Sequence, residues 1–131
     1  NPEILVTFEE ANLVTVIAPI ACSKNKVTYL LDVGMTASII ASSMGAKLLM
    51  LMSSDGLLAI NDKLVDKMDS VSIRKINQSD LPFSTKNMLQ AGIAAIENNV
   101  EHTHIIDSKD KQALLYAIFL NTHSNHLSNI L

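Results

Sequence analysis

The sequence is poor in the residues that mark several classes of protein. It holds a single cysteine, Cys22, so no internal disulfide can form and a disulfide-stapled secreted scaffold is excluded. We expect Cys22, which borders an apolar run, to be a small buried residue rather than a nucleophile. Charged residues make up only 18% of the chain and the net charge is -3, so we expect no nucleic-acid partner.

Long apolar runs are missing as well. Although 48% of the 131 residues are hydrophobic, no uninterrupted apolar stretch of about 18 residues occurs, and no signal-peptide pattern opens the chain. We therefore expect a soluble, cytoplasmic protein with no membrane partner. A chain of this length can build one sizeable core but not two, so residues 1–131 are predicted to form a single domain.

Patterns typical of helices and strands alternate along the first half of the chain. Asn1-Pro2-Glu3 predicts the start of a helix that runs to about Asn12. The β-branched apolar run from Val14 to Ile20 predicts a strand buried on both faces in a parallel sheet. The polar turn at Ser23 to Lys26 and the segment from Val27 to Leu31 then predict a small hairpin.

A helix and a strand follow this hairpin. The helix is predicted from Met35 to Met44 and ends at Gly45. The apolar run from Lys47 to Met52 then predicts a buried central strand. The periodicity between Leu57 and Pro82 is weak, which indicates edge structure there.

Within that weak stretch, a short helix is predicted from Asp62 to Met68 and a short strand from Val71 to Ile76. Beyond it, an amphipathic helix is predicted from Ser84 to about Asn98, a strand from Thr103 to Asp107, and a helix from Lys109 to Asn121. Helices that alternate with buried strands favour an α/β fold, a three-layer αβα sandwich with a mostly parallel sheet.

The turn Ser53-Ser54-Asp55-Gly56 follows a buried strand, and ligands bind at the carboxyl ends of strands in open α/β sheets. Asp-Gly is also an ordinary turn pair, so these residues alone leave both interpretations open. His102 and His104, and His123 and His126, are suitably spaced pairs, but nothing completes a zinc spacing and no metal site is predicted. The methionines Met44, Met50 and Met52 are expected to fill the core.

Four blocks of sequence then follow one another in a familiar order. They are Asn1–Leu5, Val16–Ala21, Gly45–Leu48 and Val100–Asp107, the last leading into Ala113–Leu115. In this order they resemble the carboxyl-terminal half of acetylglutamate kinase, a member of the amino acid kinase family. Acetylglutamate kinases phosphorylate the γ-carboxylate of N-acetylglutamate in arginine biosynthesis. The resemblance therefore implies a nucleotide-binding half and ATP with Mg²⁺ as cofactor. It also implies self-association, or pairing with an amino-terminal half that this chain lacks.

The ligand-facing motifs of that family are only partly kept. Tyr29 to Thr36 aligns with Tyr-Asn-x-Asn-Ala-Asp-Thr-Ala, which places Gly34 at the organising aspartate and Asp32 at a substrate-binding asparagine. Leu51 to Gly56 aligns with Leu-Thr-Asp-Val-Asp-Gly, which implies that Ser53, Ser54, Asp55 and Gly56 line the nucleotide.

Two further motifs have lost their glycines. Leu81 to Lys86 aligns with Gly-Gly-Met-x-x-Lys, so the resemblance implies that Lys86 is a catalytic residue that contacts the phosphates. His126 to Asn129 stands where the family has a Gly-x-Gly-Thr turn.

Each candidate residue has an ordinary alternative. Lys86 is also compatible with a solvated lysine in the first turn of a helix, and Asp32 with a carboxylate that caps a loop. A glycine at position 34 cannot hold the cations on which phosphoryl transfer depends, so we expect impaired or absent kinase activity from this chain alone. The alternative function is a non-catalytic regulatory or assembly domain, like the kinase-like domain of N-acetylglutamate synthase, which has also lost that aspartate.

Overall fold

A computed structural model describes residues 2–60, 63–65, 67–75, 81–119 and 124–128. The described elements of the first half are α1 (Pro2–Glu10), β1 (Ile20–Cys22), β2 (Thr28–Leu30), α2 (Val33–Ser43) and β3 (Leu48–Ser53). Those of the second half are β4 (Ala59–Ile60), β5 (Lys63–Leu64), β6 (Lys67–Asp69), α3 (Ser70–Lys75), α4 (Phe83–Glu97), β7 (His102–Asp107), α5 (Ala113–Phe119) and β8 (Ser124–Ser128).

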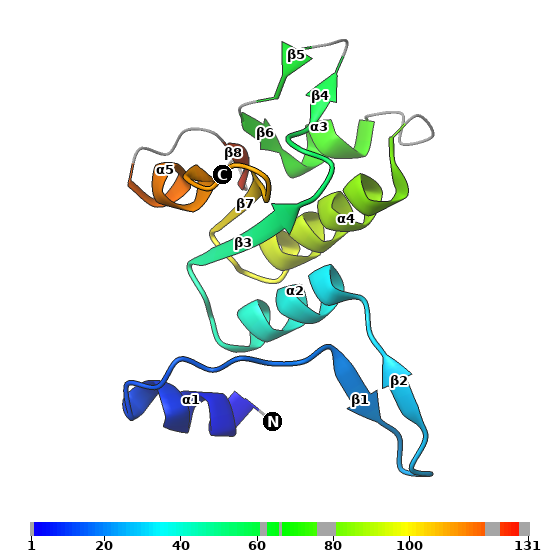
Figure 1. Cartoon of the computed structure of the whole chain (residues 1–131), viewed down its shortest axis with the longest axis vertical. Coiled ribbons are helices and arrows are strands. Elements are labelled where there is room, and N and C mark those ends of the chain that lie inside the picture. Colours follow the sequence, from blue (N-terminus) through cyan, green and yellow to red (C-terminus); the bar gives the residue numbers. More distant parts are fainter. Residues whose placement is uncertain (1, 61–62, 66, 76–80, 120–123, 129–131) are drawn as a thin grey trace.

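A four-stranded sheet with the order β3-β7-β8-β6 forms the centre of the molecule (Figure 1). The β3 and β7 strands pair in parallel from Leu48 opposite His102 to Ser53 opposite Asp107. The β8 strand pairs antiparallel with β7 and parallel with β6. The predicted α/β class with a mostly parallel sheet is therefore confirmed.

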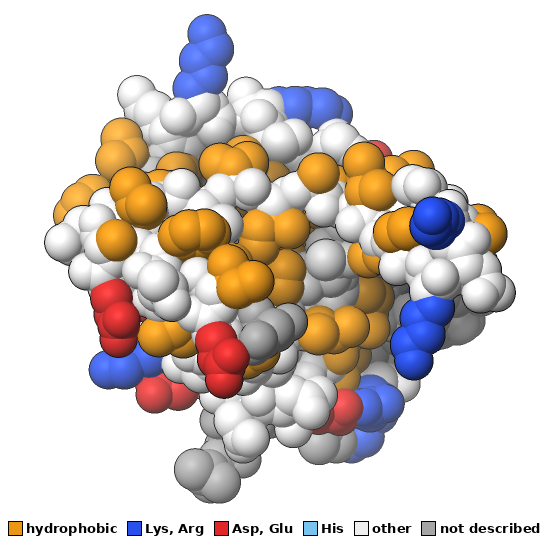
Figure 2. All heavy atoms as spheres, turned by 90° about the horizontal axis from the view of Figure 1, so that it is seen from below, with side chains coloured by type: hydrophobic (Ala, Val, Ile, Leu, Met, Phe, Trp, Pro, Cys, Tyr) orange, Lys and Arg blue, Asp and Glu red, His pale blue; other side chains and the backbone are white. Residues whose placement is uncertain are grey.

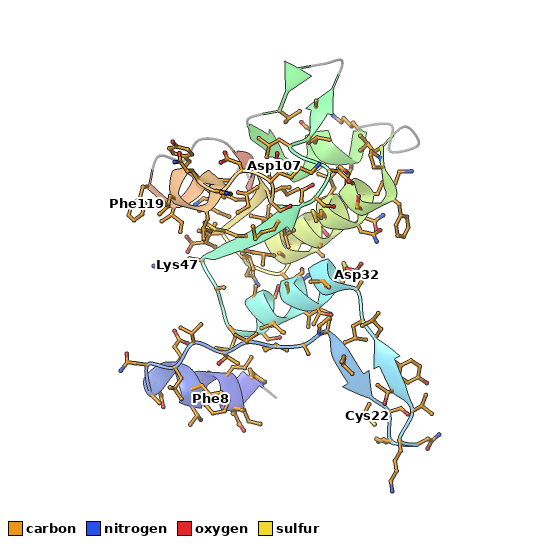
Figure 3. All side chains as sticks on the ribbon, viewed as in Figure 1. Phe8, Cys22, Asp32, Lys47, Asp107 and Phe119 are labelled. Atoms are coloured by element: carbon orange, nitrogen blue, oxygen red, sulfur yellow. The ribbon has the colours of Figure 1, made fainter. Side chains whose placement is uncertain are left out.

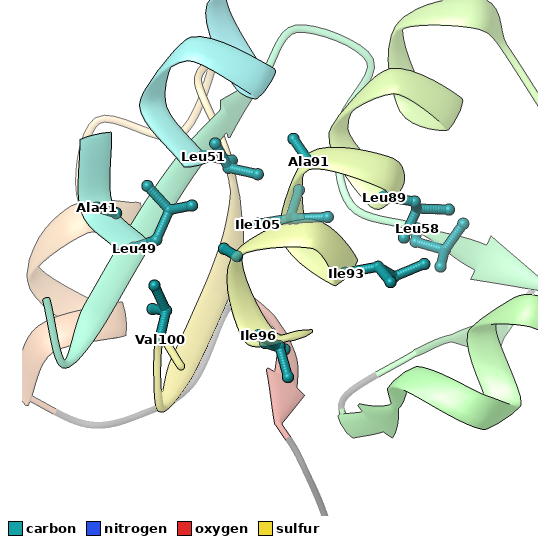
Figure 4. Packing of buried hydrophobic residues seen from close by; sticks show 11 residues of the cluster. Ala41, Leu49, Leu51, Leu58, Leu89, Ala91, Ile93, Ile96, Val100 and Ile105 are labelled. Carbon is teal, nitrogen blue, oxygen red and sulfur yellow. The ribbon is translucent and has the colours of Figure 1, made fainter. Parts of the chain in front are cut away.

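Helices cover both faces of this sheet. On one face α4 packs against β3 and β7, and α2 packs against α4 and β3, while α5 packs against β7 on the other face. Neighbouring residues of β7 show the alternation, because Ile105 joins the core beneath α4 whereas Ile106 packs with Ala113 and Ala117 of α5. Figure 4 shows the larger core, in which Leu89 of α4 is fully buried.

The ends of α2 follow from local sequence. The carboxylate of Asp32 caps its first turn, since Oδ1 accepts a hydrogen bond of 2.8 Å from the backbone N–H of Met35. Gly45, just beyond the last turn, has a φ of 62°, a conformation that glycine adopts without the steric cost of a Cβ. The structure confirms the helices predicted at α1, α2 and α4, the hairpin, and the strands predicted at β3 and β7. Asn1, which was expected to cap α1, lies outside the described residues.

The prediction of a buried strand from Val14 to Ile20 was wrong. The strand β1 begins only at Ile20 and pairs antiparallel with β2, and the side chains of Val14 and Val16 are 94% and 93% exposed. Within the described part of the chain, no strand lies beside this extended segment to bury it. Cys22, at the end of β1, is exposed rather than buried as expected.

The weakly periodic middle of the chain was also predicted incorrectly. Instead of a helix from Asp62 to Met68, the described residues form β5 and β6, and instead of a strand from Val71 the chain forms the helix α3. Asp62 and Ile76 lie outside the described residues. These short segments take their conformation from tertiary pairing, because β6 forms the sheet edge against β8. The edge location itself was predicted correctly.

The carboxyl-terminal part differs from expectation in two places. The helix predicted from Lys109 begins only at Ala113, because the Asp110 carboxylate holds a turn by accepting a hydrogen bond from the backbone N–H of Gln112. Asn121 lies outside the described residues. The segment aligned with a family turn, His126 to Ser128, belongs to the strand β8, and Asn129 lies outside the described residues.

The amino-terminal third of the chain leaves an apolar surface uncovered. Figure 2 looks onto this side and shows apolar side chains across its middle, with charged side chains mostly toward its margins. The exposed apolar residues come from α1, from the segment 13–20, from the hairpin and from α2; examples are Ile4, Val14, Val16, Leu30 and Ile39. None of the described helices has the length and apolar character that crossing a bilayer requires.

Candidate functional site

Three structural features meet at one edge of the sheet. The parallel strands β3 and β7 end there, at Ser53 and Asp107, and the helices α2 and α4 begin there. Figure 3 labels Asp32 at the start of α2 and Asp107 at the end of β7, whereas Lys47 lies at the opposite end of β3. Ligand sites of open α/β sheets form at this type of edge.

The loop Ser53 to Gly56 is held firmly at this edge. Ser53 is buried, its carbonyl accepts a hydrogen bond of 2.8 Å from the backbone N–H of Ser108, and its Oγ accepts one of 3.2 Å from the backbone N–H of Asp55. Gly56 has a φ of 83°, and a Cβ there would lie 3.7 Å from the Asp107 carboxylate. The chain therefore turns directly after β3, as the Asp-Gly pair predicted, and Ser54 and Asp55 are exposed.

A side-chain contact joins this loop to α4. The Ser84 Oγ donates a hydrogen bond to Oδ2 of Asp55. Lys86 lies two residues further along α4, is half-buried, and donates its backbone N–H to the carbonyl of Pro82 over 3.0 Å. Because Pro82 provides no side-chain cap, the amides of the first turn have no capping side chain. The helix that carries Lys86 and the loop 53–56 therefore lie at one edge of the sheet.

Asp32 has the role of a helix cap. Besides the hydrogen bond to Met35, its Oδ2 accepts one of 3.3 Å from Nδ2 of Asn87 in α4. Asp32 was expected either to bind substrate or to cap a loop, and in the structure its carboxylate caps the helix α2. Sequence reasoning missed Asn87, although its position one turn beyond Ser84 on α4 would have indicated the same helix face.

Gly34 lies where α2 and α4 touch. A Cβ at position 34 would lie 3.1 Å from the Cβ of Ala91, which is fully buried, and 3.5 Å from Oδ1 of Asp32. A separation of 3.1 Å is shorter than ordinary van der Waals contact between carbons. The position of the family's organising aspartate is therefore part of a close helix–helix contact in this chain.

A cavity of about 620 Å³ lies between the start of α2, the second half of β3 and the start of α4. Its polar lining consists of Asp32, Ser84 and Asn87, and most of the remaining wall is apolar. Neither Lys86 nor any residue of the loop 53–56 lines it. Of the predicted site residues, the structure therefore places only Asp32 in the cavity wall.

Methionines supply a large part of that wall, namely Met50, Met52 and Met88. Met50 and Met52 were expected to fill the core. This was wrong for Met52, which is 55% exposed. Met50 is half-buried, packs beside Ile106 and also lines the cavity. Because β3 is the edge strand of the described sheet, side chains from both of its faces reach the cavity.

Histidines do not gather with other metal-binding side chains in the described ranges. There, no group of three or more His, Cys, Asp or Glu residues lies close enough together to hold a metal ion. His104 is buried, His102 is exposed, and each interacts with other groups of the chain. His123 lies outside the described residues.

Comparison with known proteins identifies relatives. Residues 2–107 match the family model described as the amino acid kinase family. An acetylglutamate kinase of Campylobacter fetus is 32% identical over 121 residues, which cover 91% of this chain and 43% of that protein. An acetylglutamate kinase of Ruthia magnifica is 30% identical over 115 residues, which cover 86% and 39%. The chain thus spans about two-fifths of the length of these curated relatives.

Two solved structures share the fold at low sequence identity. The N-acetylglutamate synthase of Neisseria gonorrhoeae, complexed with coenzyme A and L-arginine, superposes with a TM-score of 0.89 at 17% identity and covers 99% of this chain and 31% of that one. A carbamate kinase of Giardia lamblia bound to citric acid gives a TM-score of 0.76 at 15% identity and covers 98% and 43%. These likenesses concern the fold alone.

Proposed function

Since the chain belongs to the amino acid kinase family, we propose that it is an acetylglutamate kinase-like domain that binds nucleotide but is impaired in phosphoryl transfer. The observation that carries this proposal is Gly34, which provides no carboxylate. A Cβ at this position would lie 3.1 Å from the Cβ of Ala91. The pathway that the resemblance implies for such a domain is arginine biosynthesis, and we propose the cytoplasm as its location.

The nucleotide part of the proposal rests on Lys86 and the loop from Ser53 to Gly56. The ammonium group of Lys86 would neutralise phosphate charge, and the loop would contact the nucleotide with its backbone and with Ser54 and Asp55. The hydrogen bond between Ser84 and Asp55 supports this arrangement, since it ties the loop to the helix that carries Lys86.

A catalytic magnesium ion does not fit the described residues. Mg²⁺ requires oxygen ligands in near-ideal octahedral geometry, usually with one or two carboxylates. Position 34 offers no oxygen ligand beyond the backbone, and among the described residues no three or more His, Cys, Asp or Glu side chains gather closely enough to hold a metal ion. We therefore propose nucleotide binding that does not depend on magnesium, and we assign no reaction step to the ion.

Calorimetric titration with ATP and ADP tests the nucleotide site. We expect Lys86→Ala to weaken binding about tenfold, the scale of one charge-assisted contact. Lys47→Ala is the matched control, because Lys47 is exposed at the opposite end of β3, and it should leave affinity unchanged. Equal losses of affinity in both variants would mean that Lys86 acts only through the overall charge of the protein. No binding by a folded wild-type chain would refute the nucleotide role.

A regulatory or assembly domain is the second candidate, and the exposed apolar surface favours it. Val14 and Val16 are more than nine-tenths exposed, and monomeric proteins rarely leave large contiguous apolar patches uncovered. We propose that this surface is covered either by self-association or by an amino-terminal half corresponding to the part of the curated relatives that this chain does not span. In this case the chain would associate and nucleotide would not bind.

A further inference from the structure

We propose that the cavity between α2, β3 and α4 binds a small organic cation, that is, an ammonium or amidinium group carried on an apolar body. The inference rests on the proposed function only in using the same edge of the sheet. The residues that carry it differ from those assigned to the nucleotide, because Lys86 and the loop 53–56 do not line the cavity.

The charge of the cavity wall favours a cation over an anion. Asp32 is the only charged side chain among the described residues that line it, and no lysine or arginine does so. Among the side chains of the wall, a phosphate or carboxylate ligand would therefore meet like charge and no cationic group, whereas an organic cation would meet the opposite charge.

The apolar wall suits the body of such a ligand. The thioethers of Met50, Met52 and Met88 are flexible and polarisable, so they adapt to ligands of irregular shape. Phe83, also in the wall, is 76% exposed and supplies an aromatic ring, a group that attracts cations. A volume of about 620 Å³ lies within the usual range of small-molecule pockets.

Asp32 keeps the capacity to receive a ligand while it caps α2. Its Oδ1 accepts one hydrogen bond, from Met35, and its Oδ2 accepts one long hydrogen bond of 3.3 Å, from Asn87. A carboxylate offers about four lone-pair sites, so two acceptor positions remain for the planar fork of an amidinium group. The carboxylate is also fixed in orientation by the cap, which reduces the entropy that binding would cost.

Three probes that share one ring and differ in the charge of its substituent test the inference. Benzamidine is a cation at neutral pH, benzamide is its neutral isostere, and benzoate is the anion with the same ring. Binding is followed by NMR of methyl-labelled methionines, since Met50, Met52 and Met88 line the cavity and Met44 does not. We expect benzamidine to shift the three cavity methyl signals saturably, benzamide to bind about tenfold more weakly, and benzoate to leave the signals unmoved.

The substitution Asp32→Asn isolates the charge. Asparagine caps helices about as well as aspartate, so the fold and the start of α2 are retained. We expect benzamidine to bind this variant no better than benzamide binds the wild-type chain. Equal binding of benzoate, an unchanged benzamidine affinity in Asp32→Asn, or shifts at Met44 in place of the cavity methionines would each overturn the proposal. The ATP titrations on Lys86→Ala report separately on the nucleotide site, so either proposal can fail while the other stands.

Discussion

The contact between Gly34 and Ala91 predicts a strong energetic coupling between α2 and α4. In isolation, Gly34→Ala should stabilise α2 by up to about 1 kcal/mol, because alanine loses less conformational freedom than glycine on folding. In the wild-type chain, however, the new Cβ would lie 3.1 Å from the Cβ of Ala91, and overpacking a close contact costs typically about 1–3 kcal/mol. We therefore expect Gly34→Ala to leave the free energy of unfolding unchanged or to lower it by up to about 2 kcal/mol.

Removing the opposing methyl group should reverse this effect. In the Ala91→Gly background the space is open, so Gly34→Ala should stabilise the protein, and the double-mutant cycle should give a coupling energy of about 1–3 kcal/mol. The assay is urea unfolding of the four proteins followed by circular dichroism. Ser43→Ala is the control, since Ser43 is exposed near the far end of α2 and should show no coupling to Ala91→Gly. A cycle for Gly34 that closes within about 0.3 kcal/mol would refute the idea that position 34 is a packing site.

Two further predictions concern the surface and the core. Replacing both Val14 and Val16 by threonine keeps the β-branched shape and removes exposed apolar surface, so any self-association should shift toward monomer. Sedimentation velocity at several protein concentrations measures this shift. Unchanged association would mean that the contact lies elsewhere. Ile106→Ala should lower the free energy of unfolding by about 2–5 kcal/mol, because Ile106 of β7 is fully buried against α5. Ile39→Ala should lower it far less, because the Ile39 side chain is 62% exposed. Equal losses in the two variants would contradict the described core.

The sequence predicted the elements that carry strong periodicity. The helices α2 and α4 and the strands β3 and β7 have apolar residues at the spacing of their own secondary structure, and Gly45 was predicted to end α2. The start of α2 lies two residues before the predicted Met35, because Asp32 caps the helix. The strand β8 was missed because Ser124 to Ser128 is polar and lacks β-branched residues, so only its pairing with β7 and β6 makes it a strand. The exposed segment at Val14 shows the opposite case, since its composition is typical of a strand but no strand of the described residues pairs with it.

The candidate site was predicted in its position more than in its composition. The loop from Ser53 to Gly56 and the place of Lys86 follow from strand ends and helix starts, which local sequence specifies. The cavity was missed because the run Leu48 to Met52 is apolar on both faces, and its alternation therefore gave no sign that Met52 is exposed. The contacts of Asn87 with Asp32, and of Ala91 with Gly34, join positions more than fifty residues apart, which no local pattern reveals.

The dependence of ATP binding on magnesium tests the central claim most directly. Because position 34 carries no carboxylate and the described residues hold no cluster of metal-binding side chains, calorimetric titration should give the same ATP affinity with and without Mg²⁺, and binding should not be followed by release of ADP. Binding that tightens by about tenfold or more on addition of magnesium, about 1.4 kcal/mol, would contradict the account and indicate a competent cation site.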